Sequence, residues 1–156
     1  ALQCHGGNGF IEENPMARVY REAPLNSVWE GTANMMCMDV RRAMIRDPRT
    51  IDALFAELHP LKGQDGHFDA LVGVTERLVR EAVNDEFLAR PMTESVARSL
   101  QAADLMRYST PEVVGAFLST RCPGATGAWG SMFGTMGLTL DKTTADRIVE
   151  RADLAR

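Results

Sequence analysis

Residues 29–42 read WEGTANMMCMDVRR, and this stretch decides the fold. From Thr32 to Ile45 the chain contains neither Gly nor Pro, which predicts one long helix, and Asn26, Ser27 and Thr32 are possible caps near its start. Methionine is abundant in this helix, and apolar side chains cover most of its circumference up to Arg41 and Arg42. Such a pattern is typical of a helix that is buried in a bundle or at a subunit interface.

Breakers and apolar spacing predict further helices downstream. Asp47-Pro48-Arg49-Thr50 ends the first helix, and Thr50 can cap the next one. After residue 46, helices are expected over residues 50–58, 68–82 and 93–108. A further helix should begin at 110–112, and a polar helix should cover residues 143–154. Pro91 is expected to break the chain before the third of these. The glycine-rich residues 123–137 are expected to form a loop or a poorly ordered helix.

The residues before the long helix contain several glycines and prolines. Residues 1–15 are therefore expected to form a loop, and residues 16–23 a short helical turn. The whole chain shows no convincing strand and no internal repeat. The sequence therefore predicts an all-α fold, made of a helical bundle piece and an additional helical part.

Composition restricts the classes of protein and site that are possible. The net charge is −4 and 45% of the residues are hydrophobic, which is typical of a globular domain. The odd set Cys4, Cys37 and Cys122 contains no CxxC pair, so no disulfide framework and no metal site are expected, and a reducing cytoplasm is the expected location. Cys4 and Cys37 are expected to be buried. No apolar run has the length of a membrane span, and the opening residues indicate a fragment.

Two short motifs could carry chemistry. The cluster Gln3-x-x-Gly6-Gly7-x-Gly9-Phe10 lacks the preceding strand and following helix of a dinucleotide-binding βαβ unit. It could be a flexible turn, or a backbone whose N–H groups approach a phosphate without hindrance from a Cβ atom. The second motif, W-E-G-T over residues 29–32, is also compatible with an acid that favours the helix dipole and a threonine that caps the helix.

Together, Q-x-x-G-G-x-G-F over residues 3–10, R-V-Y-R-E-A over 18–23 and W-E-G-T over 29–32 resemble the acyl-CoA dehydrogenase family in order, spacing and residue type. The resemblance implies an FAD-dependent enzyme that dehydrogenates acyl-CoA thioesters between the α- and β-carbons. It places two groups of residues at FAD. The ADP part of a neighbouring subunit's cofactor is contacted by Gln3, Cys4, His5, Gly6 and Gly7. The flavin is contacted by Thr32, Ala33, Asn34 and Met35. Gly31 is the implied substrate contact.

The same resemblance implies that Glu30 is the catalytic base. A carboxylate that is buried beside an apolar acyl chain has a raised pKa, which suits it to remove an α-proton near neutral pH. Isovaleryl-type members of the family place the base elsewhere in their sequences, so that alternative stays open. Asn34 also stands where many dehydrogenases carry Gln.

Three stretches resemble the AidB-like branch of the family, namely residues 29–42, K-G-Q-D-G-H-F-D over 62–69 and A-D-L-M-R-Y-S-T-P over 103–111. This resemblance implies that residues 1–46 end the C-terminal helical bundle and that residues 47–156 form an AidB-like helical extension. It also implies a homotetramer for the full-length protein. The alternative function that it implies is an alkylation-response flavoprotein that binds DNA and has only vestigial dehydrogenase activity.

The charges give DNA binding little support. From residue 41 onward the sequence has fifteen Lys and Arg against sixteen Asp and Glu, whereas a duplex-binding surface is normally basic. Arg41, Arg42 and Arg46 are the candidate phosphate contacts. They could equally form a solvated face or match the dipole at the end of their helix. A domain that serves only in oligomerisation is a third possible reading of the chain.

Overall fold

The computed structural model describes residues 2–29, 31–122 and 141–152, and every regular element in these residues is helical. The α-helices are α1 (Pro15–Glu22), α2 (Ala33–Arg46), α3 (Arg49–Leu58), α4 (Gly66–Ala82), α5 (Ala89–Tyr108), α6 (Pro111–Arg121) and α7 (Lys142–Ala152). The short 3-10 helices are η1 (Leu2–Gly9), η2 (Ala23–Ser27), η3 (His59–Leu61) and η4 (Glu86–Leu88). The predicted all-α fold class is confirmed.

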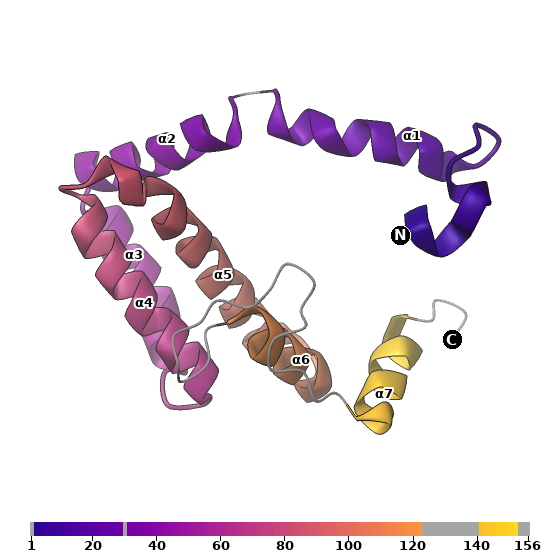
Figure 1. Cartoon of the computed structure of the whole chain (residues 1–156). Coiled ribbons are helices and arrows are strands. Elements are labelled where there is room, and N and C mark those ends of the chain that lie inside the picture. Colours follow the sequence, from indigo (N-terminus) through magenta and orange to yellow (C-terminus); the bar gives the residue numbers. More distant parts are fainter. Residues whose placement is uncertain (1, 30, 123–140, 153–156) are drawn as a thin grey trace.

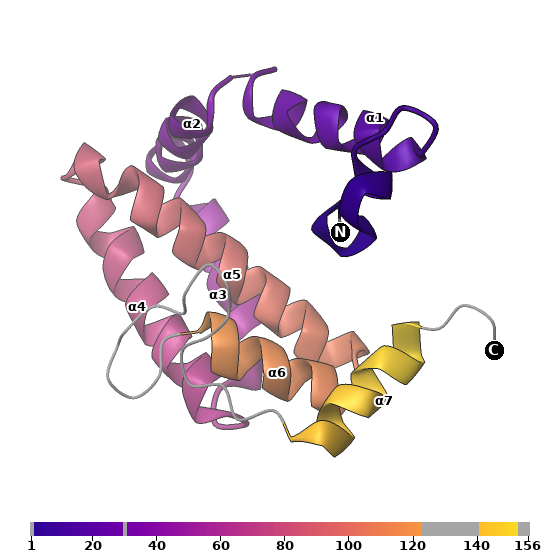
Figure 2. The ribbon, with the colours of Figure 1, turned by 45° about the vertical axis from the view of Figure 1, so that its right-hand side comes forward.

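Helix α5 is the centre of the helical body. It packs against α2, α3, α4 and α6, and α7 packs against α6. Figures 1 and 2 show η1, α1 and η2 extending away from this body beyond α2, and α1 contacts η1 and η2. Among the helices that the structure describes, none is long and apolar enough to cross a bilayer.

The core lies where α4 faces α3 and α5. Apolar residues at helical spacing place Phe68, Leu71 and Val72 on the inner side of α4, where all three are fully buried. Leu58 from α3 and Met92 from α5 complete this layer. Each fully buried side chain of this size contributes roughly 1.5–3 kcal/mol relative to leaving it exposed, so burial of this layer stabilises the bundle.

A buried group of hydroxyls joins α4 to α5. Thr75 donates from Oγ1 to the carbonyl oxygen of Leu71 at 2.9 Å, so its two lone pairs can accept from Ser95 at 2.5 Å and Ser99 at 2.8 Å. All three hydroxyl-bearing residues are fully buried. Because each hydroxyl has a partner, the polar group is compatible with the apolar core around it.

The turn before α4 explains most of the K-G-Q-D-G-H-F-D motif. Gly63 has φ +87°, a conformation that favours glycine, and its N–H donates to the Asp69 carboxylate at 2.9 and 3.2 Å. The Asp65 side chain caps α4 by accepting from the N–H groups of His67 and Phe68. These residues therefore form a structural turn that brings Phe68 into the core.

Arginines from neighbouring helices bind the backbone carbonyls at three helix C-termini. The donors and acceptors are Arg41 with Ala82 and Val83 at the end of α4, Arg98 with Arg121 at the end of α6, and Arg107 with Glu57 near the end of α3. The last carbonyls of a helix have no partner within the helix, and the negative end of the dipole attracts a cation. These arginines therefore contribute to packing between helices.

Several predicted helix boundaries are confirmed, and two details were wrong. Helix α6 begins at Pro111, as expected, although Thr110 at its N-cap position makes no side-chain capping bond to a described residue. Pro91 does not break the chain, because α5 begins at Ala89 and Pro91 falls in its first turn, where the missing N–H leaves no intrahelical bond unmade. Helix α3 also begins earlier than expected, at Arg49, and Thr50 donates to the carbonyl of Asp47 from inside the first turn.

Other predictions concern residues before α3. The expected loop over residues 1–15 contains the 3-10 helix η1, interrupted at Gly6, which has φ +56°. The expected burial of Cys4 was wrong, because Cys4 is exposed, whereas Cys37 is buried as expected. Helix α2 is less buried within this chain than its composition suggested, and Met35 and Met36 are about half exposed, at 49% and 48%.

The glycine-rich residues 123–137 lie outside the described residues.

Candidate functional site

The first candidate cluster is the turn Gln3–Gly7 in η1. All five of its residues are exposed. A Cβ atom added at Gly6 or Gly7 would meet nothing within 4 Å, so the chain's own packing does not require glycine there, although the positive φ favours it at Gly6. The turn thus presents accessible backbone to an incoming group.

Gly9, by contrast, is required by packing inside the turn. An added Cβ atom would lie 2.5 Å from the carbonyl oxygen of Leu2 and 3.1 Å from Cβ of His5. Gly9 is also buried, unlike the residues of the Gln3–Gly7 turn. The close approach of the two backbone segments therefore sets the shape of η1.

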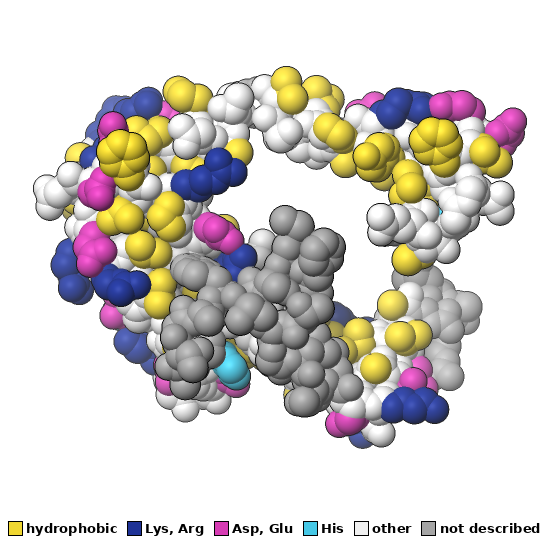
Figure 3. Space-filling view, in the orientation of Figure 1, with side chains coloured by type: hydrophobic (Ala, Val, Ile, Leu, Met, Phe, Trp, Pro, Cys, Tyr) yellow, Lys and Arg dark blue, Asp and Glu magenta, His cyan; other side chains and the backbone are white. Residues whose placement is uncertain are grey.

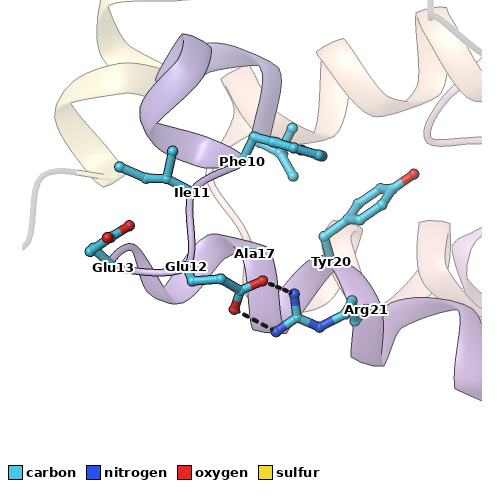
Figure 4. Close-up of a pocket in the computed structure, with 8 residues that line it drawn as sticks. Phe10, Ile11, Glu12, Glu13, Ala17, Tyr20 and Arg21 are labelled. Carbon is cyan, nitrogen blue, oxygen red and sulfur yellow. Dashed lines mark hydrogen bonds and ion pairs between the residues drawn. The ribbon is translucent and has the colours of Figure 1, made fainter.

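An open hollow of about 590 Å³ lies beside α1 (Figure 4), and it is lined by Leu2, by residues 10–13 and by the α1 residues Ala17, Tyr20 and Arg21. Its apolar side includes Phe10 and Tyr20, which are 78% and 61% exposed. Its polar side carries an ion pair in which Arg21 donates two hydrogen bonds to the Glu12 carboxylate, at 2.6 and 3.0 Å. These bonds hold the pKa of Glu12 below its usual value. The hollow has the size of a small-molecule site.

Local sequence positions α1 beside the hollow. Asn14 is the N-cap, and its side chain accepts from the N–H of Met16 at 2.9 Å. Pro15 occupies the first helical position, where its fixed φ suits a helix start. The pair between Glu12 and Arg21 was missed by sequence reasoning, since its separation of nine residues follows no helical or strand period.

The second candidate cluster is the start of α2. Thr32 is the N-cap residue, and within the described part of the chain its side chain makes no capping hydrogen bond. Ala33, Asn34 and Met35 follow it and are exposed. Gly31 has φ +111°, which favours glycine. Glu30, the predicted base, lies outside the described residues.

The structure does not bring the two clusters together. Figures 1 and 2 place η1 at the far end of the N-terminal segment, and α1 and η2 separate it from the start of α2. One subunit therefore offers two separate surfaces, at Gln3–Gly7 and at Thr32–Met35.

The candidate phosphate contacts on α2 have different surroundings. Arg41 binds the end of α4, with hydrogen bonds of 2.5 Å to Ala82 O and 2.9 Å to Val83 O. Arg42 forms an ion pair with Asp39 at 2.6 Å. Arg46 is exposed and makes no ion pair with any residue that the structure describes. Figure 3 shows Lys and Arg side chains interspersed with acidic and apolar ones on the face in view, so no uniformly basic surface is visible there.

Other ionisable groups suggest no metal centre. Within residues 2–29, 31–122 and 141–152, no three His, Cys, Asp or Glu side chains are grouped as metal ligands. A group of ionisable side chains joins η3 and the residue after it to α4, where Glu76 contacts His59 at 2.9 Å and Lys62 at 3.2 Å.

Comparison with known proteins agrees with these motifs. Residues 1–45 match the family model described as acyl-CoA dehydrogenase, C-terminal domain. The chain is 33% identical to AidB of Escherichia coli K12 over 117 residues, which is 75% of this chain and 21% of AidB. It is 26% identical to acyl-CoA dehydrogenase family member 11 of Caenorhabditis elegans over 82 residues, or 53% of this chain and 13% of that protein.

A third relative, 3-methylmercaptopropionyl-CoA dehydrogenase of Ruegeria pomeroyi, is 40% identical over 58 residues, which is 36% of this chain and 10% of that protein. The chain thus spans about a fifth of the length of AidB, and it spans a smaller share of the length of each of the other two relatives. The similarity to AidB continues well beyond the residues that the family model matches. The chain therefore belongs to the acyl-CoA dehydrogenase family, carries part of its C-terminal domain in residues 1–45, and is AidB-like.

Proposed function

We propose that the whole protein is an FAD-dependent acyl-CoA dehydrogenase in which this chain supplies part of the cofactor site and the catalytic base. The observation that carries the proposal is the pair of exposed surfaces at Gln3–Gly7 and Thr32–Met35, which lie within the residues that match the family model and in the motifs whose resemblance implies contacts to FAD. Their separation is compatible with contacts to two cofactors in an oligomer, for which we propose a homotetramer in the cytoplasm.

The residues present fit FAD. The open space beside Gly7 allows a phosphate-bearing group to reach the backbone of the turn. At the other surface, the Thr32 hydroxyl is not used in a capping bond within the described residues, and the exposed side chains of Asn34 and Met35 follow it. These groups would hold the ADP part and the flavin part, respectively.

The proposed reaction forms a double bond between the α- and β-carbons of an acyl-CoA thioester. Glu30 takes the α-proton, and the electrons of that C–H bond become the new π bond. FAD held at these two surfaces would supply the acceptor for the β-hydrogen and its bonding electrons. Gly31, without a side chain, leaves room for the substrate beside the base. Residues 47–156 would form the AidB-like extension of this enzyme.

Replacement of Glu30 by Gln in the full-length protein tests the proposal. Gln retains the size and hydrogen bonding of Glu but is not a base, so FAD content should persist while flavin reduction by acyl-CoA falls at least about a hundredfold. The control is Glu150→Gln on the exposed face of α7, which should reduce flavin at the wild-type rate. Near-normal flavin reduction in Glu30→Gln would place the base elsewhere in the protein.

DNA binding is the alternative proposal, with Arg41, Arg42 and Arg46 as phosphate contacts. The structure gives it less support, since Arg41 and Arg42 already bind other groups of the chain. If DNA is bound through phosphates, affinity should fall with rising salt, and replacing all three arginines by Ala should flatten that dependence. Undetectable or salt-independent binding would remove this alternative.

A further inference from the structure

We propose that Arg41 is a positioning residue that sets how α2, with its proposed flavin contacts, is held on the bundle formed by α3 to α6. This inference rests on the proposed function. Arg41 lies in the third turn of α2, while Thr32 and Met35 lie at its start. Because a helix is stiff over this length, roughly 14 Å at 1.5 Å per residue, the placement of Arg41 affects the placement of its first turn.

The contact is well suited to fixing a helix. Nε and one terminal nitrogen of Arg41 donate to two successive carbonyls, Ala82 O at 2.5 Å and Val83 O at 2.9 Å. These carbonyls lie at the C-terminal end of α4, where they lack partners within the helix and the dipole is negative. A planar guanidinium that makes two bonds fixes orientation as well as distance.

Helix α2 also packs against α5 and α3. Cys37 and Met44 are its buried residues, and they share one side of the helix with Arg41. Met35 and Met36, on the turn nearest to the proposed flavin contacts, are about half exposed. Packing against α5 restricts the crossing angle of α2, and the two Arg41 hydrogen bonds add a directional contact between α2 and the end of α4.

The neighbouring arginines show that this role belongs to Arg41 in particular. Arg42 pairs with Asp39 on the same helix, so it joins α2 to nothing else through that bond. Arg46 makes no hydrogen bond with any residue in the described ranges. The three arginines that look alike in sequence therefore have different roles, and only the first joins α2 to α4.

The test uses the full-length holoprotein with Arg41→Gln and Arg41→Lys, and Arg77→Gln as the control. Arg77 is exposed on α4 and makes no ion pair within the described part of the chain. The measurements are the FAD dissociation constant, the circular dichroism of the bound flavin in the visible range, and the melting temperature. The visible signal reports the flavin surroundings, which a loss of stability alone does not change.

Arg41→Gln should raise the FAD dissociation constant about tenfold, the scale of one lost hydrogen bond to a charged group, and should alter the visible circular dichroism. Arg41→Lys keeps the charge but not the two-pronged geometry, so its effect should be smaller and in the same direction. Arg77→Gln should match the wild type. If Arg41→Gln does not fold, the Lys variant decides, and a wild-type dissociation constant and spectrum in that variant overturn the inference.

Two other outcomes are also distinguishable. If Arg41→Gln melts earlier but keeps the wild-type dissociation constant and flavin spectrum, Arg41 is only stabilising and the positioning role is wrong. If the wild-type protein itself binds no FAD, the proposed function fails, and the positioning role fails with it.

Discussion

Replacement of Gly9 by Ala tests whether the shape of η1 controls FAD binding. The new Cβ atom would lie 2.5 Å from the Leu2 carbonyl oxygen, whereas ordinary contact begins near 3.4 Å, so the two must separate by about 0.9 Å. Both atoms belong to or adjoin the backbone, and neither can rotate away. The strain can be relieved only by moving the segment that contains the Gln3–Gly7 turn.

Overpacking of this kind costs about 1–3 kcal/mol. If FAD binds the wild-type shape of the turn, binding must restore the strained conformation, and the cost appears in the affinity. The FAD dissociation constant should therefore rise about 5- to 150-fold. The melting temperature of the bundle should change little, because η1 packs with α1 and lies apart from the bundle.

The assay is titration of the full-length apoprotein with FAD, followed by flavin fluorescence. Gly73→Ala is the matched control, since Gly73 is exposed on α4 and an added Cβ atom there meets nothing within 4 Å. That control should bind FAD like the wild type. A dissociation constant within about twofold of the wild type for Gly9→Ala would refute the idea that this turn holds the cofactor, since the expected range begins near fivefold.

Two further predictions concern the bundle. Thr75→Val should lower the free energy of unfolding by about 1–3 kcal/mol, because Ser95 and Ser99 lose a buried partner, and a triple variant that also carries Ser95→Ala and Ser99→Ala should lose less per hydroxyl removed. Urea denaturation measures both, and an equal loss per hydroxyl would contradict the network. Burial raises the pKa of the Cys122 thiol to about 12, so labelling of native Cys122 at pH 8 should be at least about a hundredfold slower than in denaturant. Fast native labelling would show that this thiol is accessible and ionised.

Local signals predicted much of the fold. The absence of breakers from Thr32 to Ile45 predicts α2, although only the structure chooses Thr32 over Asn26 and Ser27 as its N-cap, and Pro111 predicts the start of α6. Pro91 was misjudged because a proline in the first turn and a proline that ends a helix look the same without knowledge of where the helix begins.

Only the parts of the candidate site that lie in short sequence motifs could be predicted. The glycine turn and the start of α2 could be named from the sequence, but the role of Gly9 depends on the path of the backbone near Leu2. The bonds of Arg41 also escaped prediction, since the acceptors lie 41 and 42 residues further along the chain. Sequence patterns predict contacts between residues three or four positions apart in a helix. Contacts between residues about forty positions apart depend on tertiary packing.

The arginines that bind the ends of α3, α4 and α6 have a consequence for the response of the bundle to pH. The acceptors of these bonds are backbone carbonyls, which carry no titrating proton. Attachment between these helices therefore does not depend on an ionised carboxylate as acceptor, unlike the ion pair of Glu12 with Arg21 outside the bundle.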